Sequence, residues 1–526
     1  MSVGTSPGLP EFRVLAQDRR VIPVTRRLLV DGHTAVGLFL ALCGDRAGTF
    51  LLESAEPGRL WSRYSFIGVH SAAMLTERDG SAAWLGRAPR GVLASGNPME
   101  VLRETIDLLH TEQAPGLPPL TGGLVGYFSY DAVRRWEQVP DANPDELQIP
   151  ELAFLLATDL AAVDHTDGSV LLIANAINYD ASDDRVDEAW QDAVRRLDLM
   201  QGALGSAPPT GIWTYDGTAE PLVKANFAPA DFHASVERAQ EYIQAGDAFQ
   251  IVLSQRFQTP CAATGLDVYR ILRTSNPSPY MYLLRLPIDD GSQPDHEAGH
   301  IPDRTAFEIV GSSPEALVTV TNGHCVVHPI AGTRPRGVTP EEDAALGEEL
   351  LADEKERAEH LMLVDLARND IGRVCQPGSV AVVDFMQVER YSHVMHLVST
   401  VTGELREDCT AYDALAATFP AGTLSGAPKP RAMAIIDELE QVRRGLYGGC
   451  VGYFDFAGNV DTAIAIRTAL IKDGVAVVQA GAGIVADSVP TSEAAECRNK
   501  AAAVLRAVSL AQTLTDVSDA GPRARS

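Results

Sequence analysis

Acidic side chains recur at helical spacing in two distant stretches of the chain. In the stretch 353–370, Glu356 and Glu359 fall on neighbouring turns of an expected helix. Near the carboxyl end, Glu493 and Glu496 share one helix face. A solvated charged face is the simpler interpretation of either helix alone. Each one, however, adjoins a glycine-rich strand end that can approach a small anion, and one carboxylate from each helix, completed by water, would suit Mg²⁺.

Two further features could hold an anionic small molecule. The turn AGTLSGAPK (421–429) places Thr423, Ser425 and backbone N–H groups at the start of an expected helix, which favours a carboxylate ligand. Arg467, on an expected strand, could clamp a second carboxylate with two hydrogen bonds. GAGIVA (481–486) matches a dinucleotide-binding pattern, but no helix opens there, so that function is not expected.

Strands and helices must position these groups. FQIVLSQRF (249–257) alternates in the manner of a half-buried strand, and the runs at 315–322, 324–330, 461–471 and 474–484 continue the pattern. One long helix is expected over 344–374, and a last helix from Ser492 through Ala511. A further helix should be capped by Ser425 and closed by Gly445.

The composition shifts suggest two domains with frayed ends. We expect tails at 1–15 and 515–526, an amino-terminal domain over 16–200, a Gly/Pro-rich linker over 201–230 and a catalytic domain over 231–514. Residues 289–303 should form a surface insertion. GGLVGYF (122–128) and GGCVGYF (448–454) agree at six of seven positions, which predicts structurally equivalent strands in two related sheets.

Composition narrows the function. The 526 residues carry 43 Lys and Arg against 70 Asp and Glu, a net charge of −27, so nucleic acid is not an expected partner. No apolar run is long enough for a membrane span, and the amino terminus lacks a secretory pattern, so we expect a cytoplasmic protein. The seven scattered cysteines form no C-x-x-C pair and predict buried thiols.

Longer motifs point to a family. In order, these are LLES (51–54), NPSPYM (276–281), IVGSSPE (309–315), PIAGTRPRG (329–337), DEKERAEHLMLVDLARND (353–370), HVMHLVSTV (393–401), PAGTLSGAPK (420–429) and YGGCVGYF (447–454). Over roughly 20–510 the chain resembles component I of anthranilate synthase, a chorismate-utilising enzyme. The resemblance implies an α/β fold (of α+β type) with two large, mainly antiparallel sheets flanked by helices.

The resemblance also implies roles for individual residues. Glu359 and Glu496 match the Mg²⁺ carboxylates, and the metal would bind the ring carboxylate of chorismate. The matched substrate contacts are Gly332, Thr333, Tyr447, Arg467, Gly481, Ala482 and Gly483, and Thr423, His396 and Lys500 line the same pocket. Matches to a tryptophan feedback site are Glu53, Ser54, Arg63, Pro279, Tyr280 and Met281.

The implied reaction adds ammonia at ring C2, expels the C4 hydroxyl and then eliminates pyruvate to give anthranilate. Hydroxide leaves poorly, so a general acid is needed, and we choose Glu315 in the GSSPE turn, with His396 assisting elimination. Related isochorismate synthases carry a water-activating lysine where this chain has Gln250. Aminodeoxychorismate synthases carry a nucleophilic lysine where it has Ala331.

Partners follow from the same resemblance. No cysteine lies in the G-x-C-x-G elbow of a glutaminase, so ammonia should come from a separate amidotransferase, component II, in a heterotetramer with two copies of each subunit. Tryptophan is the expected inhibitor. Three alternatives stay open: an aminodeoxyisochorismate synthase, an aminodeoxychorismate synthase, and a non-catalytic tryptophan-sensing subunit.

Overall fold

The structure is a computed structural model that describes residues 4–54, 63–205, 211–287, 301–390 and 394–517. Its helices are α1 (Leu9–Leu15), α2 (Ala35–Cys43), α3 (Pro98–Leu108), α4 (Val186–Gly205), α5 (Pro229–Gln244), α6 (Gly265–Ser275), α7 (Pro340–Ala352), α8 (Glu354–Gly372), α9 (Ala411–Thr418), α10 (Gly422–Ser425), α11 (Lys429–Leu439) and α12 (Pro490–Ala511), with a 3-10 turn at Tyr130–Arg135.

The strands of the amino-terminal half are β1 (Thr5–Ser6), β2 (Val21–Leu29), β3 (Thr49–Glu53), β4 (Tyr64–Arg78), β5 (Ser81–Gly86), β6 (Gly123–Phe128), β7 (Leu152–Asp164) and β8 (Ser169–Ile177). Those that follow are β9 (Trp213–Thr214), β10 (Lys224–Ala225), β11 (Gln250–Pro260), β12 (Tyr280–Pro287), β13 (Thr305–Ser313), β14 (Ala316–Thr321), β15 (His324–Val327), β16 (Ile330–Pro335), β17 (Ala381–Arg390), β18 (Val394–Glu404), β19 (Gly426–Ala427), β20 (Cys450–Asp455), β21 (Val460–Ile464), β22 (Thr468–Lys472), β23 (Val475–Ile484) and β24 (Thr515–Asp516).

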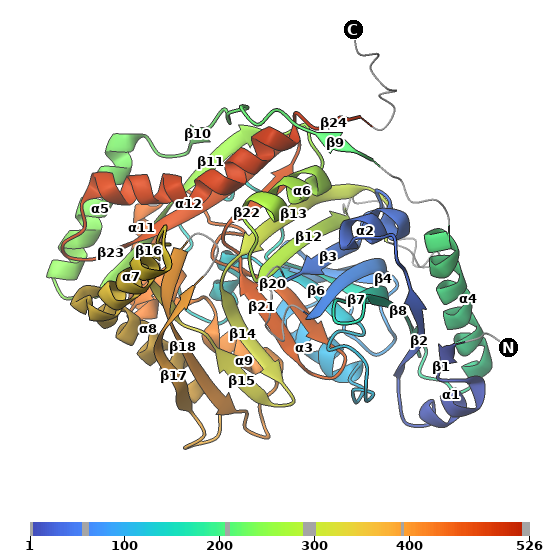
Figure 1. Cartoon of the computed structure of the whole chain (residues 1–526). Helices are drawn as coiled ribbons and strands as arrows, with labels where there is room; N and C mark the ends of the chain where they lie inside the picture. Colours follow the sequence, from blue (N-terminus) through green and yellow to red (C-terminus); the bar gives the residue numbers. More distant parts are fainter. Residues whose placement is uncertain (1–3, 55–62, 206–210, 288–300, 391–393, 518–526) are drawn as a thin grey trace, which may run out of the picture.

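The expected architecture of large antiparallel sheets flanked by helices is confirmed (Figure 1). Hydrogen bonds join 22 of the described strands into one network, and β9 pairs with β24 in a separate ribbon. The amino-terminal strands reach the rest of the sheet through two antiparallel pairs, β3 with β12 and β6 with β20. The two halves of the sequence therefore form one hydrogen-bonded network of strands and contribute to the same hydrophobic cores.

The repeated GGxVGYF segments lie side by side. β6 and β20 are adjacent strands of one network, and Gly126 is opposite Gly452. The repeats are thus neighbours in one sheet, where we expected equivalent strands in two sheets. Each glycine permits a close approach: a Cβ on Gly126 would collide with the carbonyl oxygen of Ala153, and one on Gly452 with that of Asp461.

Two expected helices are different in the structure. The helix expected over 344–374 is divided into α7 and α8 at Asp353, whose carboxylate accepts the backbone N–H groups of Lys355 and Glu356 and so caps α8. Ser425 does not cap α11, because its hydroxyl donates to the carbonyl of Ala421 and the N-cap residue is Pro428. The helix also ends well before Gly445.

The strand expected over 461–471 is also divided. β21 ends at Ile464 and β22 begins at Thr468, with Arg467 between them at a φ of 51°. A positive φ is uncommon outside glycine and cannot occur inside a regular strand. Arg467 therefore lies in a bend between two strands, whereas we expected it to lie on a strand.

The expected ends and linker contain regular structure. Residues 1–15 include β1 and α1, so they are not the frayed tail that we expected; residues 1–3 lie outside the described residues. Residues 201–230 contain the end of α4, both β9 and β10, and the start of α5. In the range 515–526, β24 is ordered and 518–526 lie outside the described residues, as does most of the predicted insertion at 289–303.

The cysteines lie mostly in the interior, as expected. Six of the seven thiols are buried, and Cys409 is partly exposed. Among the helices within the described ranges, none is both long and apolar enough to cross a bilayer.

Changing Gly452 to Ala should destabilise the fold, because the backbone of Gly452 lies so close to that of Asp461 that a new Cβ would collide with the Asp461 carbonyl oxygen. We expect the free energy of unfolding to fall by about 1–3 kcal/mol. Thermal or denaturant unfolding measures this. Gly202→Ala in α4 is the control, because nothing lies within 4 Å of its Cβ position; equal stability of the two variants would contradict the close-approach explanation.

Candidate active site

A carboxyl group that holds its proton near neutral pH lies just after β13. The side chain of Glu315 accepts a hydrogen bond from the Thr423 hydroxyl at 3.0 Å. Burial raises the pKa of Glu315 to about 7, while that hydrogen bond and the charges of Lys500 and Arg467 lower it. Glu315 can therefore donate a proton under physiological conditions, as expected for a general acid.

Glu359 and Glu496 are both tied to one pair of strands. The side-chain amide of Gln250, at the start of β11, donates to Glu359 of α8 at 3.0 Å. Lys500 forms an ion pair of 2.7 Å with Glu496 on α12 and donates to the carbonyl of Gly481 on β23 at 3.1 Å. Since β11 and β23 are hydrogen-bonded neighbours, the two helices face a common strand pair.

The two helices are close enough for their charges to interact. The ammonium group of Lys355 on α8 lowers the pKa of Glu493 on α12, although burial, the largest cause, raises that pKa overall. Burial and then the charge of Glu359 raise the pKa of Glu356. Carboxylates of α8 and α12 therefore share one region of the site.

These carboxylates suit Mg²⁺. They offer hard oxygen donors, and those of Glu356 and Glu493 are held against neighbouring negative charge. No group of three or more His, Cys, Asp or Glu side chains forms a ready metal cage in the described part of the chain. Mg²⁺ does not need such a cage, because it commonly binds one or two carboxylates, several waters and oxygens of the substrate.

Arg467 supplies a positive charge within the site. Its guanidinium makes no hydrogen bond or ion pair with any other residue that the structure describes, and burial lowers its pKa. A partly buried cation in this state favours an anionic ligand. Its backbone is held in the bend by the N–H of Ser312, which donates to the Arg467 carbonyl at 3.1 Å.

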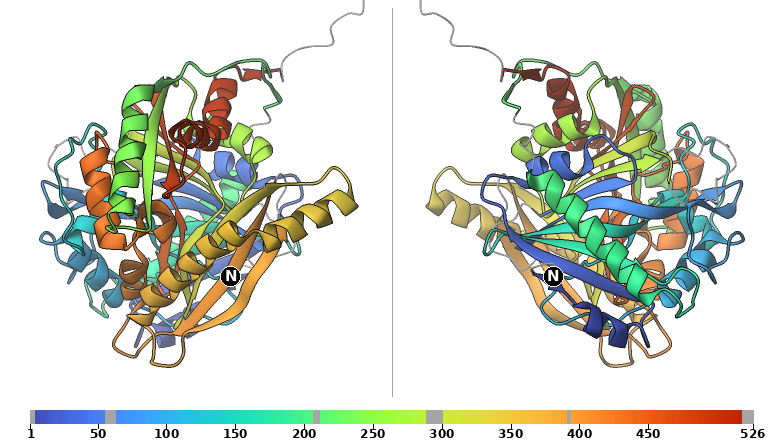
Figure 2. Two further views of the ribbon diagram at one scale, coloured as in Figure 1. Left: turned by 90° about the vertical axis from the view of Figure 1, so that its left-hand side faces the viewer. Right: turned by 90° about the vertical axis from the view of Figure 1, so that its right-hand side faces the viewer.

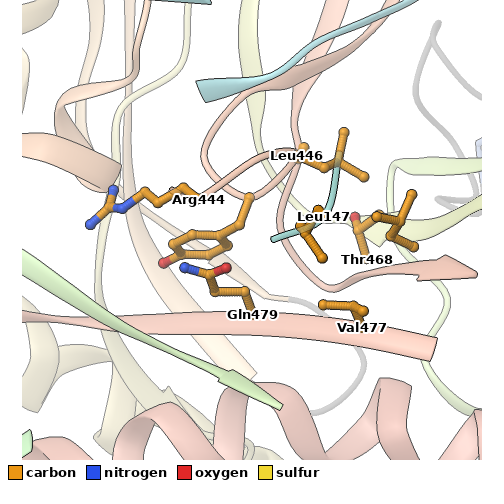
Figure 3. A pocket seen from close by; sticks show the side chains of 9 residues that line it. Leu147, Arg444, Leu446, Thr468, Val477 and Gln479 are labelled. Carbon is orange, nitrogen blue, oxygen red and sulfur yellow. The ribbon is translucent and has the colours of Figure 1, made fainter. Parts of the chain in front are cut away.

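Tyr447 lies beside a small pocket next to this region. Figure 3 shows Arg444 and Gln479 among the side chains that line it; the volume is about 20 Å³, enough for one water. The phenol of Tyr447 is buried, which raises its pKa strongly. It is therefore a hydrogen-bond donor at any physiological pH.

Glycines keep the strand surface open. A Cβ on Gly481 would lie 2.6 Å from the Tyr447 hydroxyl, and one on Gly483 would lie 2.7 Å from the Gln250 amide nitrogen. Ala482 alternates to the opposite face, and its side chain is fully buried in the hydrophobic core. Any contact of Ala482 with substrate must therefore come from its backbone.

His396 carries a defined proton. Its Nδ1 lies 2.8 Å from the carbonyl oxygen of Gly332, which can only accept, and 3.2 Å from the Thr333 hydroxyl. Nδ1 is therefore the protonated nitrogen, and Nε2 carries the lone pair of the neutral ring. Burial, the largest cause, lowers the pKa of His396, so the neutral form is favoured.

Comparison with known proteins decides the family. The model for chorismate binding enzymes matches residues 49–506. Anthranilate synthase component 1 of Mycolicibacterium smegmatis is 57% identical over 506 residues, covering 96% of this chain and 94% of the relative; that of Arthrobacter globiformis is 54% identical over 516 residues, covering 98% and 95%. The chain belongs to the anthranilate synthase component I family of chorismate binding enzymes.

A solved structure agrees with this assignment. Anthranilate synthase component I from Streptococcus pneumoniae TIGR4 superimposes with a TM-score of 0.70 at 34% sequence identity, covering 91% of this chain and 99% of that one. The predicted family and fold are thereby confirmed.

The motifs expected to bind the effector in this family meet on two neighbouring strands inside the sheet. β3 pairs with β12, and Glu53 is opposite Met281. The Glu53 carboxylate accepts from the Tyr269 hydroxyl at 2.6 Å and lies 3.2 Å from Arg273. The Ser54 hydroxyl is buried and has no hydrogen-bond partner among the residues that the structure describes.

The remaining expected effector residues are placed differently from one another. Pro279 directly precedes β12, and the Tyr280 hydroxyl donates to Asp461 at 3.1 Å. The exposed Arg63 binds Asp164 at 2.7 Å and stacks on its neighbour Tyr64. Within the described part of the chain, the Arg63 side chain makes no hydrogen bond or ion pair with Glu53, Ser54 or Met281, with which the sequence analysis grouped it.

A buried ion pair that contacts β11 was not predicted from the sequence. Arg444 binds Glu440 at 2.7 Å, with side-chain exposures of 1% and 4%, and it also donates to the carbonyls of Val252 and Leu424. Glu440 accepts from the backbone N–H of Ser254. The pair joins β11 to the Thr423 turn. The i, i+4 spacing was the available signal, but it resembles that of an exposed helix.

Replacing Thr423 with Val should raise the pKa of Glu315 above about 7, because the lost hydroxyl donor favours the ionised carboxylate. The carboxyl C=O band in infrared difference spectra across pH measures this pKa, and Glu315→Gln identifies the band by removing it. A wild-type pKa near the ordinary 4.5, or no change in Thr423→Val, would contradict the assigned environment.

Proposed function

We propose that the chain converts chorismate and ammonia into anthranilate and pyruvate, as a Mg²⁺-dependent lyase. The observation that carries this proposal is the buried Glu315 beside Thr423, near the charges of Lys500 and of Arg467, whose guanidinium has no partner among the described residues. A proton donor next to cations can expel the C4 hydroxyl as water from a dianionic substrate.

The chain's own residues divide the remaining work. Arg467, assisted by the Tyr447 hydroxyl, holds the enolpyruvyl carboxylate. Bound Mg²⁺ would hold the ring carboxylate and neutralise its charge, with Glu359 and Glu496 as its protein ligands. After ammonia adds at C2, Nε2 of His396 accepts the C2 proton, the bond from C3 to the enolpyruvyl oxygen breaks, and the released enolate takes up a proton to become pyruvate.

Two side chains favour this reaction over its relatives. Gln250 donates its amide to Glu359, and an amide is not a base, which disfavours activation of water at C2. Ala331 on β16 cannot form a covalent adduct with the ring. Direct attack by ammonia remains. We propose that a separate amidotransferase, component II, supplies that ammonia in an assembly with two copies of each subunit.

Purified chain with chorismate, Mg²⁺ and ammonium at alkaline pH should produce anthranilate, followed by its fluorescence. Glu359→Gln and Glu496→Gln should each lower kcat/KM by about a hundredfold or more, because each removes a charged metal ligand. Glu354→Gln on the exposed side of α8 is the matched control.

The outcomes separate the alternatives. Mass detection of an accumulating enolpyruvyl intermediate would favour an aminodeoxyisochorismate synthase, and no turnover would favour a sensing subunit. Full activity in both Gln variants would remove these carboxylates from the metal site.

We further propose that tryptophan inhibits by binding beside Ser54, where β3 pairs with β12. Ser54→Phe puts a bulky ring at the position of the buried hydroxyl and should raise the inhibitory concentration of tryptophan about tenfold or more, with ammonium-dependent anthranilate formation retained. Ser54→Ala, which adds no volume, should have a smaller effect. Unchanged sensitivity in Ser54→Phe would place the effector elsewhere.

A further inference from the structure

A second cavity lies in the amino-terminal half, away from the residues discussed above. It has a volume of about 640 Å³, within the range of small-molecule sites. Helices α1 and α4 form one side, and β2 and β8 form the other, with Phe12, Ile22, Ala176 and Met200 in the lining. The right-hand view in Figure 2 shows α4 crossing this side of the molecule above α1.

The lining is cationic in an acidic protein. Seven arginines and four carboxylates line the cavity, whereas the whole chain has a net charge of −27. Arg20 and Arg46 donate only to backbone carbonyls, and Arg87 stacks on the ring of Tyr179 at 4.8 Å. Within the described ranges, none of these three arginines forms an ion pair with a carboxylate; the charge of Arg46 acts on Asp159, whose ion-pair partner is Arg196.

Two further groups indicate a ligand. Partial burial lowers the pKa of Arg20, and no neighbouring carboxylate raises it. Asn175, 2% exposed, donates its side-chain amide to the carbonyls of Thr121 and Thr158, and its side-chain oxygen has no hydrogen-bond partner in the described part of the chain. The cavity thus offers positive charge, one unused acceptor and an apolar wall.

We propose that this cavity binds a small phosphate monoester with an apolar or aromatic body. Several separate guanidinium groups suit a phosphate, whose oxygens accept from more than one direction. The apolar wall, including Ile22 and Val69, suits the organic body, and the Asn175 oxygen accepts from a ligand hydroxyl. Such a site is independent of chorismate conversion.

Calorimetric titration of the full chain with phenyl phosphate tests the proposal. We expect saturable binding that is weaker for inorganic phosphate, which lacks the ring. The double variant Arg46→Gln, Arg87→Gln should bind about tenfold more weakly or worse, since two charged donors are lost. Arg238→Gln, an exposed arginine on α5 outside the cavity, should bind like wild type.

Further variants show which site the phenyl phosphate occupies. Arg467→Gln should retain phenyl phosphate binding; loss there would place the probe in the chorismate site and overturn the proposal. Absence of binding to wild type, or equal affinity in the double variant, would also overturn it. Thermal unfolding checks the fold of each variant. If the double variant does not fold, Arg87→Gln alone, which removes an exposed side chain with no hydrogen bond, takes its place.

Discussion

The pairing of β11 with β23 is the constraint on which the site depends. Ser254 is opposite Gly481, and Val252 is opposite Gly483. From this strand pair Gln250 reaches Glu359 on α8, and the Gly481 carbonyl reaches Lys500 and so Glu496 on α12. Because the strands fix the distance between these anchors, carboxylates far apart in sequence can serve one divalent ion.

Burial sets the chemistry of the charged groups around this pair. Burial raises the pKa of Glu315 and lowers that of His396. Both shifts favour the uncharged form, which is a proton donor for Glu315 and a proton acceptor for His396. The same burial would be costly for Arg444 and Glu440, but they neutralise each other. Arg467 has no such partner among the described residues, which reserves its charge for a ligand.

The sequence predicted the parts with a strong local signal. The alternation in 249–257 predicted β11, and the long motifs predicted the family. The break at Asp353 was hidden because an N-cap aspartate within a charged stretch resembles a solvated helix face. Arg467 at positive φ was also hidden, since the bend depends on tertiary contacts such as that with Ser312. The Glu440–Arg444 pair was missed for the same reason.

Crystals grown with Mn²⁺ in place of Mg²⁺ and soaked with chorismate give the most direct test, through the anomalous signal of the metal. The account predicts one peak at about 2.1–2.2 Å from an oxygen of both Glu359 and Glu496, with the ring carboxylate of the ligand completing the shell. A peak bound by only one of them, or the two carboxylates facing different cavities, would contradict the central claim.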